Sequence, residues 1–241
     1  HTALGRFLRL HDRWSEEILI EPSPGQSVYA PDDFFGGDLA GIREKLPYLA
    51  SLGVTALYLN PIFESASNHR YDTADYHRID PILGNEEAFC ALAEEARALG
   101  IRLMLDGVFS HTGADSRYFD RYGRYEDLGA YESPDSPYYS WYRFSAYPEG
   151  YDCWWNFPAL PNVNELDPGY GDFILGDQGV LAHWAGAGAT SWRLDVADEL
   201  PDEFIRAIRH RLKRDDPEAV LIGEVWEDCS NKQGPEGRRA Y

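Results

Sequence analysis

Residues 101–106 read Ile-Arg-Leu-Met-Leu-Asp, and residues 190–195 read Thr-Ser-Trp-Arg-Leu-Asp. Each stretch is a short, β-rich and mostly apolar run that ends in a carboxylate. Two similar runs lie at residues 54–59 and 219–222. Runs of this kind are typical of strands that are buried on both faces of a sheet. The four runs therefore predict four buried strands.

Helical patterns alternate with these strands. The signals are N-cap residues, apolar residues at helical spacing and terminal glycines. We expect helices at residues 38–53, 85–100 and 179–188, and a further helix after Pro201. Alternation of helices and strands implies right-handed crossovers and a parallel sheet, hence an α/β fold.

Two stretches break this rhythm. Residues 1–37 contain several prolines and a glycine pair, and we interpret them as loop. Residues 112–170 are rich in Tyr, Trp, Pro, Gly and Asp without a long periodic segment. This second stretch is too long for an ordinary connection, so we expect a functional insertion with its own small fold.

The composition excludes some partners. The 241 residues include 41 acidic and 22 basic side chains, for a net charge of −19. Such a chain repels phosphate backbones, so no nucleic acid partner is expected. A neutral polyol is compatible with this charge, and the seven Trp and sixteen Tyr residues offer flat surfaces for sugar rings.

Other features concern the membrane, the compartment and the cysteines. No apolar run of 18 residues occurs, so no membrane span is expected. No signal peptide is visible at residues 1–4, which slightly favours a cytoplasmic location. Three widely spaced cysteines without a metal-binding or redox pattern are expected to be thiols.

Three carboxylates occupy equivalent places in the predicted sheet. Asp106, Asp195 and Glu224 each follow a predicted parallel strand. In a (β/α) barrel, the ends of neighbouring strands direct catalytic side chains towards one point. A structural role as a satisfied strand-end acid or a helix N-cap is the alternative for each residue taken alone.

Two carboxylates that face one cleft are the requirement of glycoside hydrolysis. Arg193 lies two residues before Asp195, so both side chains point to the same face of the strand. A guanidinium there would keep Asp195 ionised, as a nucleophile must be. Glu224 precedes Val225 and Trp226, an apolar setting that suits a general acid. We expect about 5–5.5 Å between the two carboxyl groups.

Several blocks of the sequence resemble those of the alpha-amylase family of retaining glycoside hydrolases. They follow one another with family-like spacing, and their wording is nearest to the neopullulanase, cyclomaltodextrinase and amylopullulanase group. The blocks are residues 60–62, 69–76, 106–111, 160–164, 192–199 and 223–226.

The resemblance implies roles for single residues. Asp195 would be the nucleophile and Glu224 the acid/base. Arg193 would orient and ionise Asp195, and Asp106 would pair with Arg193. The reaction would be retaining hydrolysis of α-glucans or malto-oligosaccharides, at α-1,4 links with α-1,6 links as a further option.

Three more residues would bind the substrate. Tyr71, next to Asp72 in a loop typical of the family, would stack beneath the sugar ring that is cleaved. His111 would bind the hydroxymethyl group of that sugar. Packing roles are the alternative for Tyr71 and His111. The aromatic residues Trp141, Tyr142, Trp154 and Trp155 fit the core of the insertion and a sugar platform equally well.

The resemblance also implies a partial TIM (β/α)8 barrel, comprising about strands 2 to 5, with an inserted domain B after strand 3. Residues 1–111 would form the N-terminal loop region and the first part of the barrel, 112–170 domain B, and 171–241 the continuation. The sequence lacks the family's Asn-His-Asp block with a third catalytic carboxylate. We therefore expect little or no hydrolase activity from this chain alone.

No cofactor is required for this chemistry, but calcium is common in the family. Ser110 stands where many members have a calcium-binding Asn, and a hydroxyl is a poorer ligand. Gly36 and Asp38 match part of another calcium site of the family. Capping of a helix is the favoured alternative for Asp38.

Two rival functions remain at this point. A glucanotransferase of the same family would use the same residues, and acceptor-site details would distinguish it. A non-catalytic sugar-binding or scaffold relative would have lost the catalytic carboxylates, whereas Asp195 and Glu224 are both present. Linkage preference and oligomeric state are left open by the sequence.

Overall fold

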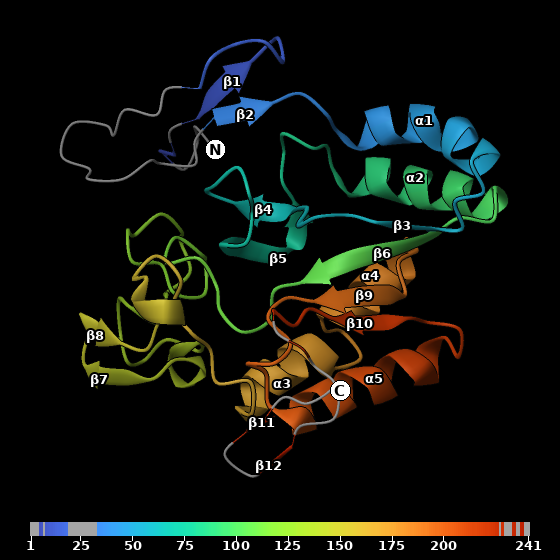
Figure 1. Cartoon of the computed structure of the whole chain (residues 1–241). Helices are drawn as coiled ribbons and strands as arrows, with labels where there is room; N and C mark the ends of the chain where they lie inside the picture. The colour runs from blue at the N-terminus through green and yellow to red at the C-terminus, as the bar shows by residue number, and fades with distance from the viewer. Residues whose placement is uncertain are drawn as a thin grey trace.

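A parallel four-stranded sheet forms the centre of the computed structural model (Figure 1). The structure describes residues 5–6, 8–18, 33–226 and 228, with the backbone of 233–234 and 237–238. The strand order is β10-β9-β6-β3, and all neighbours are parallel. The four predicted strands are confirmed as β3 (Ala56–Tyr58), β6 (Arg102–Gly107), β9 (Ser191–Leu194) and β10 (Leu221–Gly223).

The register of the sheet aligns the carboxyl ends of three strands. Asp106 on β6 lies opposite Arg193 on β9, and Leu194 lies opposite Gly223 on β10. Asp195 and Glu224 are the next residues of their strands, so they emerge at the same edge as Asp106. Side chains at this edge of a parallel sheet converge, as in barrel enzymes.

The predicted helices are also confirmed. The carboxylate of Asp38 accepts a hydrogen bond from the backbone of Gly41 at 2.7 Å, and Asn85 caps the next helix through Ala88 at 2.9 Å. In Figure 1, α1 and α2 lie beyond β3 at one end of the row of strands, and α5 lies beside β10 at the other. The helices are α1 (Leu39–Ser51), α2 (Glu86–Ala98), α4 (Val180–Ala187) and α5 (Asp202–Asp215).

The interpretation of residues 1–37 as loop is wrong in part. Short strands β1 (Arg9–His11) and β2 (Asp33–Phe35) form a parallel pair. His11 Nε2 lies 2.7 Å from Asp33 Oδ1, and Arg9 donates to the same carboxylate at 2.9 Å. Because polar contacts hold this pair, no hydrophobic alternation marks it in the sequence. Residues 1–4, 7 and 19–32 lie outside the described part of the chain.

Two further elements were not predicted. An antiparallel hairpin of β4 (Phe63–Ser65) and β5 (Thr73–Ile79) follows β3. Helix α3 (Pro168–Leu175) begins before residue 170, and Asp167 caps it. Its eight residues include two glycines, so the helix is too short and too irregular to show a clear period.

The segment between β6 and α3 holds only short elements. It lies to the left in Figure 1, beyond the carboxyl ends of the sheet strands. Antiparallel bridges tie His111 to Asn162 and Tyr142 to Val163, so the end of the segment returns to its beginning. The elements of this segment are η2 (Tyr139–Trp141), β7 (Phe144–Ala146), β8 (Gly150–Tyr151) and η3 (Trp154–Asn156). Near the other end of the chain, the short strands β11 (Gln233–Gly234) and β12 (Gly237–Arg238) follow β10.

The two outer strands of the sheet leave apolar side chains exposed. Val220 and Ile222 at β10 are 42% and 49% exposed, and Tyr58 on β3 is 40% exposed.

No helix within the described residues is long and apolar enough to cross a membrane. Cys90 and Cys153 are free thiols, and Cys229 lies outside the described residues.

Trp184 joins the helices to the hairpin inside the core. Its indole is fully buried and packs on Phe63 and Phe89 at ring distances of 5.1 and 5.3 Å. The indole Nε1 donates a hydrogen bond to the carbonyl of Tyr76 at 2.8 Å. The ring therefore fills a space that α2, α4 and both hairpin strands share.

We predict that Trp184→Ala lowers the free energy of unfolding by about 3–5 kcal/mol, because it leaves a cavity and an unpaired carbonyl. Urea unfolding followed by circular dichroism measures this change. Trp14→Ala is the matched control, because Trp14 is 82% exposed. Equal losses in the two variants would contradict the assignment of Trp184 to the core.

Candidate active site

The guanidinium of Arg193 contacts all three carboxylates that the sequence placed at strand ends. Its Nη1 donates to both oxygens of Asp106 at 2.8 Å and to Asp195 Oδ1 at 2.9 Å. Its Nη2 lies 2.8 Å from Glu224 Oε1. The other oxygen of Glu224 accepts from the backbone of Val196 at 3.1 Å. The structure therefore brings Asp106, Asp195 and Glu224 together around one cation.

Burial dominates the charge state of Asp195. Its side chain is 9% exposed, and desolvation, followed by the charge of Asp106, raises the pKa of Asp195 to about 7. Arg193 acts in the opposite direction without outweighing these effects, while Glu224 adds to them. Desolvation also raises the pKa of Asp106. Arg193 thus lowers the pKa of Asp195, as expected. Burial and the charge of Asp106 outweigh this effect, so the expectation that Arg193 keeps Asp195 ionised is wrong for the net pKa.

Two tyrosines complete the surroundings of Asp106. The hydroxyl groups of Tyr58 and Tyr71 both donate to Asp106 Oδ2, the latter at 3.4 Å. The guanidinium of Arg193 also lies over the ring of Tyr71, with its Cζ atom 5.9 Å from the ring centroid. Tyr58 was not singled out from the sequence, although its position near the end of a predicted strand was a usable signal.

His111 is buried, and the protein uses both of its ring nitrogens. Nδ1 lies 2.9 Å from the Ser110 hydroxyl and Nε2 lies 3.1 Å from the carbonyl of Tyr71. A carbonyl only accepts, so Nε2 carries the hydrogen and Ser110 donates to Nδ1. Burial lowers the pKa of His111 to about 4. A sugar hydroxyl would have to share the Nε2 hydrogen with Tyr71.

Asp72 points away from this cluster. Its carboxylate accepts from the hydroxyl groups of Ser65 and Ser67 and from the Ser67 backbone. It lines a separate pocket of about 240 Å³ together with Arg6 and Asp115. The carboxylate of Asp72 is therefore directed towards the hairpin and the segment between β6 and α3 rather than towards Asp195.

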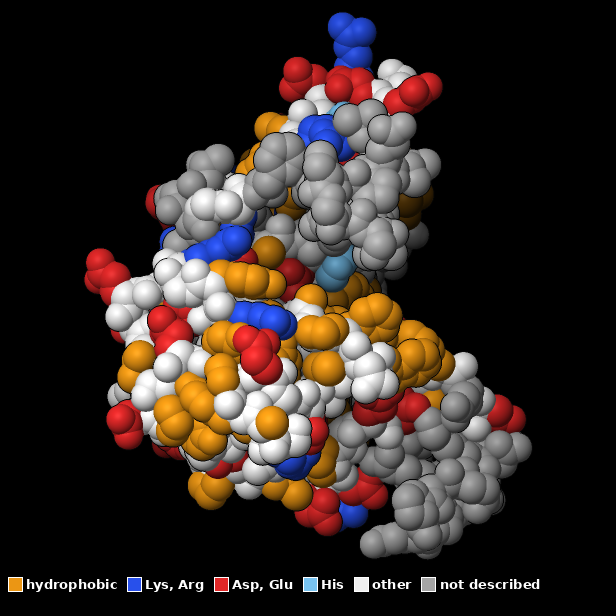
Figure 2. Space-filling view, turned by 90° about the vertical axis from the view of Figure 1, so that its left-hand side faces the viewer, with side chains coloured by type: hydrophobic (Ala, Val, Ile, Leu, Met, Phe, Trp, Pro, Cys, Tyr) orange, Lys and Arg blue, Asp and Glu red, His pale blue; other side chains and the backbone are white. Residues whose placement is uncertain are grey.

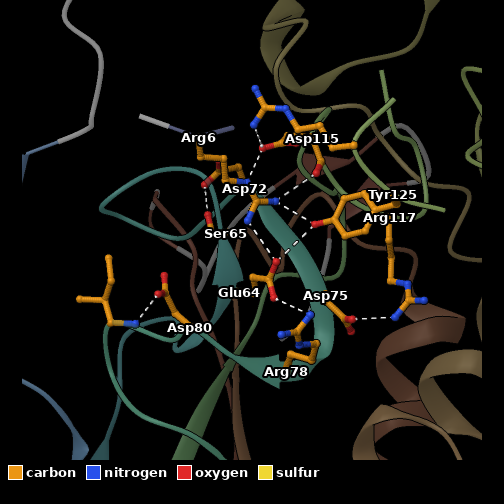
Figure 3. Close-up of polar contacts among 12 residues, drawn as sticks. Arg6, Glu64, Ser65, Asp72, Asp75, Arg78, Asp80, Asp115, Arg117 and Tyr125 are labelled. Atoms are coloured by element: carbon orange, nitrogen blue, oxygen red, sulfur yellow. Dashed lines mark hydrogen bonds and ion pairs between the residues drawn. The ribbon is translucent and has the colours of Figure 1, made fainter. Parts of the chain in front are cut away.

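A buried ion network lies beside Asp72 (Figure 3). Arg6 donates to Asp115 at 2.6 Å and to Glu64 at 3.1 Å, and its side chain is only 2% exposed. The hydroxyl of Tyr125 lies 2.8 Å from Arg6. This network joins an N-terminal residue to β4 and to the segment between β6 and α3, and sequence periodicity gives no signal for it.

Asp38, one of the two calcium candidates, caps helix α1, and Gly36 lies two residues before it. Asp38 Oδ1 is bound to the backbone of Gly41. Within the described residues, no group of three or more His, Cys, Asp or Glu side chains is placed to hold a metal ion. Calcium prefers six to eight oxygen ligands, so these two residues alone fit it poorly.

A pocket of about 430 Å³ opens beside the carboxylates, within the size range of ligand sites. Of the four aromatic residues named from the sequence, Trp141 and Tyr142 are buried core, whereas Trp155 is 58% exposed. Figure 2 shows hydrophobic side chains gathered along one wall of the hollowed side of the molecule. The pocket is lined by His69, Tyr71, His111, Trp154, Phe157, Leu160, Asp195, Val196, Glu224 and Trp226.

Comparisons with known proteins show the family to which this chain belongs. Residues 11–169 match the family described as "Alpha amylase, catalytic domain". An amylopullulanase from Thermoanaerobacterium saccharolyticum is 41% identical over 92% of this chain, which spans 19% of that protein. Neopullulanase 2 from Thermoactinomyces vulgaris is 38% identical over 90% of this chain, which spans 40% of that protein.

A solved structure, Ttha1563 from Thermus thermophilus, superposes with a TM-score of 0.73. It is 40% identical, and the alignment covers 92% of this chain and 47% of that one. The chain thus spans less than half of the length of these relatives. It belongs to the alpha-amylase family, whose catalytic domain has a TIM-barrel fold.

Proposed function

We propose that the protein carrying this chain is a retaining α-glucan hydrolase, with Asp195 as nucleophile and Glu224 as acid/base. The observation that carries the proposal is the contact of Arg193 with Asp106, Asp195 and Glu224 beside an aromatic-lined pocket. A pair of carboxylates and a sugar-sized pocket are the parts that double displacement requires.

In the proposed reaction, Asp195 attacks the anomeric carbon while Glu224 protonates the departing glycosidic oxygen. The resulting bond between sugar and Asp195 is then cleaved by water, which Glu224 deprotonates. Each substitution inverts the anomeric carbon, so the product keeps the α-configuration. The mechanism requires carboxyl groups about 5–5.5 Å apart, and that separation stays a prediction for Asp195 and Glu224.

Other residues would act by positioning. Asp106 and Arg193 would fix the orientation of Asp195, and Tyr71 would stack beneath the sugar at the cleavage point. His111 would bind the hydroxymethyl group through its Nε2 hydrogen. Asp72 would act indirectly, by ordering the loop that carries Tyr71, because its own carboxylate binds two serines.

The names of the relatives direct the choice of substrate. The amylopullulanase and the neopullulanase are each named for action on pullulan. We propose malto-oligosaccharides and pullulan as substrates, hence α-1,4 links and, as a second option, α-1,6 links. No cofactor enters the proposed steps.

We also propose that β3, β6, β9 and β10 correspond to strands 2 to 5 of the family's barrel. The exposed apolar side chains at the outer strands support this, because further barrel strands would cover them. Residues 1–111 and 171–241 would belong to the barrel, and 112–170 would be the domain inserted after its third strand.

The site would reduce the stability of the fold. A carboxylate that is buried beside two others ionises less readily than in the unfolded chain, where its usual pKa is 3.8. The folded state therefore binds more protons than the unfolded chain between about pH 4 and 7, so the free energy of unfolding falls as the pH rises through that range. Attack on the sugar would require the ionised form of Asp195, whereas the stability of the fold favours its protonated form.

We predict that Asp195→Asn and Glu224→Gln each lower kcat on maltotriose and pullulan by about 10³-fold or more, since each removes a reacting group. Hydrolysis by the protein that carries the chain is measured by product chromatography, with NMR for the anomeric configuration. Glu44→Gln on the exposed face of α1 is the control and should leave kcat unchanged. Full activity in either site variant, or a β-configured product, would refute the assignment.

We predict that Asp195→Asn raises the free energy of unfolding above pH 7 and that this difference disappears below about pH 4. The amide keeps the hydrogen bond to Arg193 without a charge to desolvate. Urea unfolding at pH 4, 6 and 8 measures it. Asp135→Asn, at an exposed position, should show no such pH dependence. A site variant less stable than the parent at pH 8 would contradict the effect of burial.

A further inference from the structure

An exposed aromatic surface continues outward from the pocket that holds Asp195 and Glu224. Trp155, Phe157 and Trp226 are 58%, 56% and 60% exposed. Phe157 and Trp226 also line the pocket, so the surface and the pocket are continuous. Exposed apolar patches of this kind mark binding surfaces, and aromatic rings are suited to the apolar faces of sugars.

Trp155 occupies the outer part of this surface in a fixed position. Its ring stacks on Trp154 at 5.3 Å and meets Trp226 edge-on at 5.4 Å. Its indole Nε1 donates to Glu199 Oε1 at 2.9 Å. One face of the indole therefore packs on protein, while more than half of the side chain remains open to solvent.

The backbone under Trp155 is strained. Trp155 and Asn156 have φ values of 46° and 62°, a left-handed conformation that side chains other than glycine rarely adopt. At Trp155 this conformation costs about 1–3 kcal/mol, whereas Asn adopts it more readily, and strain of this kind concentrates at ligand-binding sites. Packing on Trp154 and Trp226 uses only part of the indole, and Trp155 remains 58% exposed despite the cost of its backbone conformation.

Glu199 connects Trp155 to the catalytic carboxylates. Glu199 donates its backbone N–H to the carbonyl of Val196 at 2.8 Å, closing the turn that follows Asp195. The backbone N–H of Val196 in turn binds Glu224. The turn that binds the acid/base thus also holds the indole of Trp155.

We propose that Trp155 is a binding platform for a glucose unit on the leaving-group side of the cleaved bond, and that Glu199 is the residue that positions it. This inference rests on the proposed hydrolase function. Glu224 faces the departing oxygen in that function, and the aromatic surface begins beside Glu224. A glucan that leaves the pocket past Trp226 therefore reaches Trp155 one or more sugar units further out.

A platform outside the pocket acts only on substrates long enough to reach it. For Trp155→Ala we expect the KM for maltohexaose to rise about tenfold, the effect of an aromatic contact worth up to about 1.4 kcal/mol, with the value for maltotriose nearly unchanged. Glu199→Ala should reproduce part of this length-dependent loss. Glu199→Gln retains an oxygen acceptor for the indole and should behave like the parent.

Kinetics with maltotriose to maltoheptaose test this in the protein that carries the chain, and calorimetric titration with maltohexaose in an Asp195→Asn background tests binding without turnover. Trp14→Ala is the control for an exposed indole elsewhere. No effect, or equal losses for short and long substrates, would overturn the platform. If Trp155→Ala does not fold, equal behaviour of Glu199→Ala and Glu199→Gln would overturn it. Activity that survives Asp195→Asn would instead overturn the hydrolase function itself.

Discussion

Arg193 lies between three carboxylates, and the arrangement of the site depends on its charge. Without this guanidinium, Asp106, Asp195 and Glu224 would be three acids at one edge of a sheet with no common cation among their described contacts. The free-energy cost of desolvating these charged side chains is offset only where the geometry of their charged hydrogen bonds is good. The parallel register supplies this geometry, because it sets Asp106 opposite Arg193.

One cation cannot neutralise three anions, and the raised pKa of Asp195 reflects the negative charge that Arg193 leaves uncompensated. Burial and Asp106 raise it to about 7 although Arg193 is in direct contact. Asp106 receives further hydrogen bonds from Tyr58 and Tyr71, which favour its charged form. Both tyrosine hydroxyls are directed at Asp106 rather than at Asp195, so Asp195 is the carboxylate whose charge costs most. This difference separates an acid that supports the site from one that would react.

The cluster of three carboxylates was predictable because it depends on the period of strands. An acid after a short apolar run marks the end of a buried strand, and parallel strands bring such ends together. Arg193 and Asp195 share a face for the same reason. Tyr58 follows the same rule, so the sequence contained the signal for it.

Other features depend on contacts between distant residues that have no period. His11 and Asp33 hold β1 to β2, and Arg6 reaches Asp115 across more than a hundred residues of chain. The bond between Trp155 and Glu199 likewise joins the segment between β6 and α3 to the turn after Asp195. A single sequence shows these residues only as isolated charges and rings. Their pairing becomes visible once the fold fixes which loops meet.

The turn after Asp195 shows why the strained positions belong to the site. Val196 has a φ of 40°, which is costly for a β-branched residue. This conformation accompanies a backbone N–H directed at Glu224 and a carbonyl directed at the N–H of Glu199. A relaxed turn would redirect both groups, separating Glu224 from the turn that also anchors Trp155. The strain is therefore best understood as the cost of fixing a carboxylate and an aromatic ring from one short segment.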